Sequence, residues 1–244
     1  MKHFRSLVAL TLCLCLLMTC TGNAFAVEIS RKTCVLHKMS HCTVTGFKDN
    51  RYAEGRPLII FFLGSQECFS WLNSLTFIRD QKIFGELDAD LLFVTLPKAE
   101  LWYRLWEAAD REVCDFLMEK LAGAQFPIIV DAVSFGGYGG CFLTGLLREN
   151  GITVQELNLA DACNSNCVYA DTVRDIALGG TKVNIFGSTA SNNISKNTRT
   201  VIEELEGTEN VTTMVFQCRH AKVLNKAITE LGLHGDLPRE TKEQ

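Results

Sequence analysis

The sequence is poor in proline and carries no dominant charge. Only 4 of its 244 residues are proline, and 24 Lys and Arg against 28 Asp and Glu give a formal net charge of −4. With 47% hydrophobic residues, this composition excludes a disordered or collagen-like chain and is typical of a globular protein. No run of Lys or Arg exceeds two residues. The basic stripe of a nucleic-acid-binding protein is therefore absent, and we expect no nucleic-acid partner.

Several cofactor signatures are also absent from the sequence. The glycine run at 136–140 lacks the G-x-x-x-x-G-K-[ST] spacing of a phosphate-binding loop. No paired C-x-x-C motif marks a zinc site. We therefore expect neither a metal nor an organic cofactor. A weaker alternative is a structural zinc ion, whose ligands would be Cys163, Cys167, Cys218 and His220.

One apolar run stands at the N-terminus. Residues 7–18 are apolar except for one threonine, basic residues precede them, and a small-x-small site follows at Ala24-Phe25-Ala26. This pattern is typical of a secretory signal peptide, and the run is shorter than the roughly 20 residues that span a bilayer. We predict a signal peptide over 1–26 and a secreted or periplasmic product without stable membrane insertion. The alternative is a lipid anchor at Cys20.

The cysteines are numerous for a chain of this size. Three of the eleven lie in the predicted signal peptide, which leaves eight, an even number in an exported protein. Disulfide bonds are therefore expected, and the two pairs closest in sequence are Cys34–Cys42 and Cys163–Cys167. The spacing does not fix the connectivity.

Short apolar runs alternate with longer amphipathic segments along the rest of the chain. The predicted strands are 58–63, 91–96, 126–133, 154–159, 183–186 and 211–216, and the predicted helices are 100–121, 136–149, 170–178, 195–205 and 221–231. This alternation predicts an α/β fold, with a mainly parallel twisted sheet and helices on both faces, as a single domain over 27–244. Residues 27–56 are less regular and could form a leading antiparallel hairpin.

The most informative segment surrounds Ser134. An apolar strand runs directly into this serine, and a glycine-rich helix start follows it. A sharp strand-to-helix turn needs small residues two positions to either side, and here these are Ala132 and Gly136. Such a turn would hold the serine above the carboxyl edge of the sheet, where ligands bind in α/β proteins. The alternative is a serine that caps a buried helix.

The A-x-S-x-G-G segment resembles the G-x-S-x-G nucleophile elbow of the α/β-hydrolase superfamily, in which alanine is an accepted variant at the first position. The resemblance implies a three-layer α/β sandwich and a serine hydrolase, most simply one that acts on an ester of a small-molecule or acylated substrate. Ser134 would be the nucleophile. The backbone N–H groups of Phe135 and of Ser65 or Gln66 would bind the oxyanion. No long insertion follows the strand at 154–159, so we expect no large lid.

The resemblance also places a catalytic histidine after the last strand. His220 follows the strand at 211–216 by a short loop. The other histidines beyond the predicted signal peptide lie before the sheet or near the end of the last helix; they are His37, His41 and His234. His220 is therefore the expected base.

The acid departs from the superfamily pattern. Its usual place follows the penultimate strand, but residues 187–195 contain no Asp or Glu. Three alternatives remain: Asp161 at the end of the preceding strand, an amide from Asn192 or Asn193, or no acid at all in a degenerate binding protein at the cell surface. An asparagine can orient an imidazole but cannot offset its charge, and losing that charge costs about 10⁴ in rate in one well-studied triad. This comparison favours Asp161.

Overall fold

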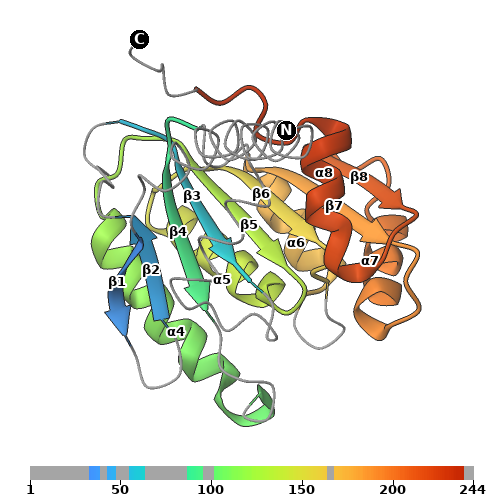
Figure 1. Ribbon diagram of the computed structural model, residues 1–244, viewed down its shortest axis with the longest axis horizontal. Helices are drawn as coiled ribbons and strands as arrows, with labels where there is room; N and C mark the ends of the chain where they lie inside the picture. Colours follow the sequence, from blue (N-terminus) through green and yellow to red (C-terminus); the bar gives the residue numbers. More distant parts are fainter. Residues whose placement is uncertain are drawn as a thin grey trace, which may run out of the picture. The chain divides into compact units, whose positions relative to one another are not determined.

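The structure is a computed structural model that describes residues 33–38, 43–47, 55–63, 87–95, 102–163 and 168–238. These residues all belong to one compact unit, Thr33–Gln244, shown in Figure 1. The predicted signal peptide, 1–26, lies outside the described residues. Within the described ranges, no helix is long and apolar enough to cross a membrane.

An eight-stranded sheet forms the centre of this unit. Its strand order is β1-β2-β4-β3-β5-β6-β7-β8. The strands are β1 (Thr33–Lys38), β2 (Thr43–Phe47), β3 (Leu58–Phe62), β4 (Asp90–Thr95), β5 (Ile128–Val133), β6 (Val154–Ala160), β7 (Lys182–Ser188) and β8 (Val211–Phe216). The six strands from β4 to β8 in this order pair in parallel. An antiparallel hairpin of β1 and β2 extends the sheet beside β4, as the irregular start of the chain suggested.

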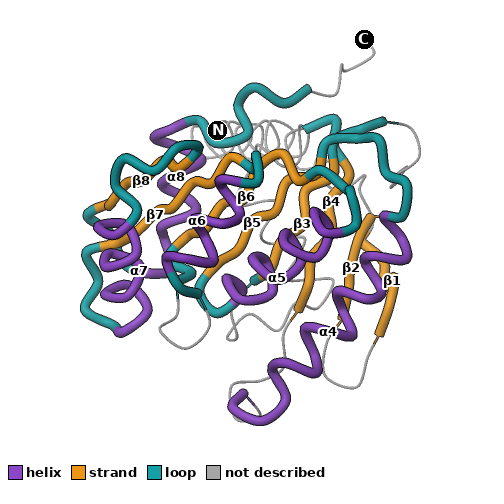
Figure 2. Tube along the Cα trace, turned by 180° about the vertical axis from the view of Figure 1, so that it is seen from behind, coloured by secondary structure: helices purple, strands orange, loops and turns teal. Residues whose placement is uncertain are grey.

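Helices cover both faces of the sheet. They are α4 (Trp102–Leu121), α5 (Gly136–Glu149), α6 (Ala170–Leu178), α7 (Asn193–Glu204) and α8 (Val223–Leu231). Helix α8 lies on the face toward the viewer in Figure 1, whereas α4 to α7 lie on the face seen in Figure 2. The predicted fold class is confirmed. Helix α8 begins two residues later than predicted, because His220–Lys222 forms a separate 3₁₀ turn, η3.

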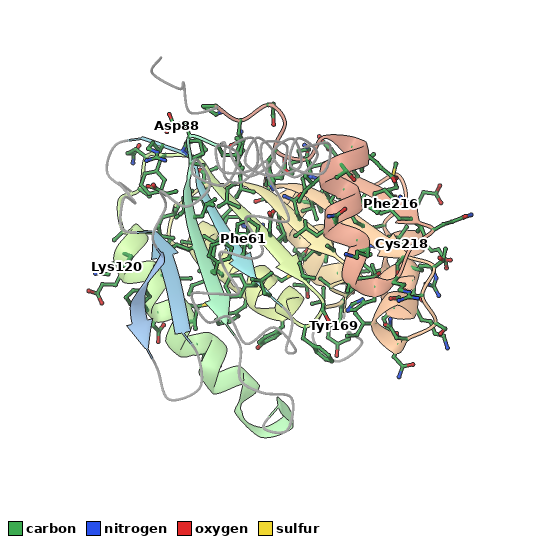
Figure 3. The ribbon with its side chains drawn as sticks, viewed as in Figure 1. Phe61, Asp88, Lys120, Tyr169, Phe216 and Cys218 are labelled. Carbon is green, nitrogen blue, oxygen red and sulfur yellow. The ribbon has the colours of Figure 1, made fainter. Side chains whose placement is uncertain are left out.

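The apolar strands separate two cores. Side chains alternate along a strand, so Ile60 and Phe62 of β3 pack on the side of α4 to α7, while Ile59 and Phe61 pack on the side of α8. Phe61, labelled in Figure 3, stacks on Phe93 of β4 with the ring centroids 5.0 Å apart. All residues of β3 are buried, which explains its continuous hydrophobic run.

A buried polar ladder crosses the sheet on the side of α8. Its members are Asp131 of β5, Asn158 of β6 and Asn184 of β7, which lie opposite one another in the strand register. The Nδ2 of Asn158 donates to Asp131 over 2.8 Å, and the Nδ2 of Asn184 donates to Asn158 over 2.7 Å. His234, beyond α8, completes the ladder with its Nε2 2.9 Å from Oδ2 of Asp131. A one-residue slip would leave these polar groups unpaired in the core, so the ladder fixes the register of three strands.

We predict that His234→Gln destabilises the protein most at acidic pH. Burial alone would lower the pKa of His234, but the charge and the hydrogen bond of Asp131 outweigh it and raise this pKa. The ion pair therefore contributes fully below about pH 6.5, the ordinary pKa of histidine, and is lost as the pH rises through the raised pKa of folded His234. Removing one partner of a buried ion pair costs about 3 kcal/mol.

Urea unfolding of the wild type and of His234→Gln between about pH 5.5 and 9 measures this difference. The difference in free energy of unfolding should shrink steadily as the pH rises. A difference that stays constant or grows with pH would contradict the ion pair between His234 and Asp131.

Candidate active site

The predicted site residues follow the carboxyl ends of neighbouring parallel strands. Ser134 comes directly after β5, and Asp161 comes directly after β6. The last residues of these strands, Val133 and Ala160, lie opposite each other in the register. His220 begins η3, a few residues after β8. The arrowheads of β3, β4 and β5 point to this edge in Figure 1, where α/β proteins bind their ligands.

Ser134 has an unusual backbone conformation. Its φ of 55° lies in the left-handed region, which costs a non-glycine residue on the order of 1–3 kcal/mol. Two hydrogen bonds hold this turn: the N–H of Ser134 donates to the carbonyl of Ala160 over 3.2 Å, and the N–H of Gly137 donates to the carbonyl of Ser134 over 3.2 Å. The side chain of Ser134 is half-buried. This strained strand-to-helix turn is the geometry that the A-x-S-x-G-G segment predicts.

The glycines after Ser134 let the start of α5 approach neighbouring backbone closely. A Cβ on Gly136 would lie 2.1 Å from the carbonyl oxygen of Phe62, at the end of β3, and a Cβ on Gly137 would lie 1.9 Å from the carbonyl oxygen of Ala162. The start of α5 therefore packs closely against the end of β3 and the segment that follows β6. Any side chain at either position would push the elbow away from the sheet.

The alanine at the first position of the motif has a packing explanation. A Cβ on Gly140 would lie 2.8 Å from the Cβ of Ala132. Gly140 has no side chain, so there is room beside it for the methyl group of Ala132. The departure from G-x-S-x-G is thus accommodated one turn along α5.

The carboxylate of Asp161 is fully buried and contacts His220. Its Oδ2 lies 3.0 Å from Nδ1 of His220 and accepts hydrogen bonds from the hydroxyls of Ser195, over 2.7 Å, and of Ser188. Its Oδ1 accepts from the N–H of Ser188 over 2.9 Å. Burial alone would raise the pKa of Asp161, but the hydrogen bonds from His220, Ser188 and Ser195 outweigh it, so the pKa is lowered. Asp161 is therefore ionised at neutral pH.

The structure separates the candidates for a partner of His220. Asn192 uses its side-chain oxygen to cap α7, accepting from the N–H of Ser195 over 2.9 Å. Asn193 is the first residue of α7 and is exposed. Asp161 is the candidate whose side chain contacts the imidazole.

Of the backbone N–H groups predicted to bind the oxyanion, only that of Phe135 lies within the described residues. Phe135 lies between Ser134 and the first residue of α5, at the N-terminus of that helix. Ser65 and Gln66 lie outside the described residues.

Sequence reasoning missed Ser188 and Ser195. Both belong to the segment 187–195, which attracts notice for its lack of acids rather than for its hydroxyl donors. The available signal was the pair Ser195 and Thr198, because residues three apart in a helix share one face. Both side chains are fully buried, and the hydroxyl of Thr198 accepts from the N–H of Cys163 over 3.2 Å.

The disulfide bond that the spacing of Cys163 and Cys167 would allow is not formed. Cys163 is a free thiol, buried in the core on the side of α4 to α7. Burial is the main cause that raises the pKa of Cys163 far above the ordinary value, and the nearby Cys141 adds to it. The thiol of Cys163 therefore stays protonated. Cys34–Cys42 stays a prediction, because Cys42 lies outside the described residues.

Cys114, Cys141 and Cys218 form no disulfide bond either. Cys114 and Cys141 are buried, and Cys218, labelled in Figure 3, is half-buried between β8 and η3. Burial and then the charge of Asp161 raise the pKa of Cys218, which disfavours a reactive thiolate. Among the described residues, no group of three or more His, Cys, Asp or Glu could hold a metal ion.

We predict opposite effects for two alanine substitutions in α5. Gly137→Ala should destabilise the protein by about 3 kcal/mol, because its Cβ meets the backbone of Ala162. Gly145→Ala is the matched control: nothing lies within 4 Å of the position that its new methyl group would take, so it should stabilise α5 by up to about 1 kcal/mol. Chemical denaturation measures both values. Equal effects at the two positions would contradict the close approach.

Comparisons with known proteins agree with this architecture. No protein-family model and no curated protein matches the chain. A solved structure of a Staphylococcus aureus protein that was assigned as an esterase matches with a TM-score of 0.54 at 12% identity. The match covers 87% of this chain and 85% of that one. An α/β-hydrolase from the metagenome of Lake Arreo matches with a TM-score of 0.52 at 13% identity, over 85% and 79%.

A thermophilic carboxylesterase from a metagenomic library matches to a similar degree. Its TM-score is 0.52 at 10% identity, over 86% of this chain and 88% of that one. Likeness at such low identity establishes the fold and leaves the activity to the site itself. The order of the strands, the elbow at Ser134 and these structural matches lead to one conclusion: the chain has the α/β-hydrolase fold.

Proposed function

We propose that the protein is a serine hydrolase that cleaves carboxylic esters, with Ser134 as the nucleophile, His220 as the base and Asp161 as the acid. The observation that carries the proposal is the contact between the ionised carboxylate of Asp161 and Nδ1 of His220, at the sheet edge that also carries the strained Ser134. Ser134 and Asp161 both come from strand ends, which are rigid supports for a catalytic group.

The contact to Asp161 determines the role of each imidazole nitrogen. Nδ1 faces a carboxylate that only accepts hydrogen bonds, so Nδ1 carries the proton and Nε2 keeps its lone pair. Nε2 can then take the proton of Ser134 while Oγ attacks the ester carbonyl carbon. The carbonyl oxygen gains the negative charge, the C–O bond to the alcohol breaks, and His220 returns the proton to the leaving alcohol. Water repeats these steps on the acyl-enzyme and releases the acid.

The oxyanion is the remaining charge in this mechanism. The N–H of Phe135 lies at the start of α5, where the helix dipole favours a negative charge. We propose that this N–H and that of Ser65 or Gln66 bind the oxyanion, and removing one such donor typically costs about 10²–10³ in rate.

Two features bear on the kind of substrate and on the location of the enzyme. Residues 161–181 connect β6 and β7, and the described part of this short connection consists mainly of α6, without an element that could act as a lid. We therefore propose a small-molecule or acylated substrate that enters an open site. The pattern of residues 1–26 supports export of the enzyme by a cleaved signal peptide.

The alternative of a non-catalytic binding protein depended on the lack of an acid in 187–195. Asp161 supplies an ionised carboxylate to His220 from another strand. This contact supports the hydrolase over the degenerate binding protein.

We expect a fluorophosphonate probe to label Ser134. The wild type should form one covalent adduct, since the probe reacts only with a serine that a base activates. Ser134→Ala should not be labelled, and His220→Ala should react at least about 10³-fold more slowly. Ser191→Ala, which removes an exposed serine near the site, is the matched control and should react like the wild type. Folded wild type that takes up no probe would rule out the hydrolase.

A further inference from the structure

Two serine hydroxyls surround the acid of the proposed triad. We propose that Ser188 and Ser195 are positioning residues that hold the carboxylate of Asp161 toward His220 and keep it charged. The inference rests on the proposed function, because it concerns the efficiency of that same site. Both side chains are fully buried, and each donates to Oδ2, the carboxylate oxygen that faces His220.

Ser188 contacts both oxygens of the carboxylate. Its backbone N–H donates to Oδ1 over 2.9 Å, while its hydroxyl donates to Oδ2. A group held at both oxygens cannot rotate about its Cβ–Cγ bond without breaking a charge-assisted hydrogen bond. The N–H of Ala190 donates to the oxygen of Ser188 over 3.3 Å, so the hydroxyl proton remains available to Asp161. Arg199 fixes this segment by donating to the carbonyls of Ser188 and Ala190.

Ser195 behaves differently from the other hydroxyl residues of α7. The hydroxyls of Thr198 and Thr200 donate to carbonyls one turn earlier in the helix, which is the common arrangement for a helical Ser or Thr. The hydroxyl of Ser195 instead donates across to Asp161 over 2.7 Å. Helix capping does not require it, because the side chain of Asn192 already accepts from the N–H of Ser195. The hydroxyl of Ser195 is thus directed to the acid.

His220 and the two serine hydroxyls together keep Asp161 charged. The titratable groups near Asp161 are His220 in η3 and the thiols of Cys163 and Cys218, whose pKa values burial raises and the charge of Asp161 helps to raise. The charged Arg199 holds the neighbouring segment through the carbonyl of Ser188. Both thiols stay neutral because their pKa values are raised. The hydrogen bonds of His220, Ser188 and Ser195 outweigh the burial of Asp161 and lower its pKa, and the two serines supply the part that does not depend on the base. Without them, we expect Asp161 to protonate at higher pH and to lose its fixed orientation.

Steady-state hydrolysis of a p-nitrophenyl ester as a function of pH tests the proposal. The variants are Ser188→Ala and Ser195→Ala, with Ser191→Ala as the exposed control. Each buried variant should lose roughly 10–100-fold in kcat, the worth of a hydrogen bond to a charged group, with KM nearly unchanged. The acidic limb of kcat/KM should also move to higher pH, which a purely structural role would not cause. Ser195→Thr, which keeps the hydroxyl, should recover most of the loss.

Each outcome decides the question. Folded Ser188→Ala and Ser195→Ala with the kcat and the pH profile of Ser191→Ala would overturn the positioning role while leaving the hydrolase intact. If Ser188→Ala does not fold, Ser195→Ala and Ser195→Cys, whose thiol is only a weak donor, give the answer. If the folded wild type shows no ester hydrolysis, or only hydrolysis that Ser134→Ala retains, both this inference and the proposed function are overturned.

Discussion

The burial of one carboxylate constrains the whole site. Asp161 is fully buried, and a buried charge is tolerated only when it is paired and hydrogen-bonded. Its partners come from three elements that are distant in sequence: the end of β7, the first turn of α7 and η3. Satisfying this charge therefore requires that these elements meet at the carboxyl edge of the sheet, where the proposed nucleophile, Ser134, also lies.

The polar ladder of Asp131, Asn158 and Asn184 supports this arrangement from within the sheet. Ser134 lies three residues beyond Asp131, and Asp161 lies three residues beyond Asn158. A ladder that fixes the register of β5, β6 and β7 thus also fixes the relative height of the site residues at the strand ends. The stability of the core and the geometry of the site depend on the same strand alignment.

Local sequence patterns were sufficient to predict part of the fold and of the site. Continuous apolar runs predicted the parallel strands, and the small residues around Ser134 predicted the elbow, because both signals arise from neighbouring residues. The acid and its serine donors were harder to find, since Asp161 and His220 are 59 residues apart and meet only through the strand order. The pair of Asp131 and His234, 103 residues apart, was missed for the same reason. The spacing of Cys163 and Cys167 allowed a disulfide bond, but spacing alone does not reveal that the thiol of Cys163 is buried in a core.

The central claim is that an acid at the end of β6, Asp161, serves the base that follows β8. The most direct test is kcat for ester hydrolysis by Asp161→Asn, with the exposed Asp171→Asn as the control. An asparagine preserves the shape of the side chain but cannot offset the charge that His220 acquires, so we expect kcat to fall about 10⁴-fold in a folded variant. A folded Asp161→Asn that retains the kcat of Asp171→Asn would contradict the account.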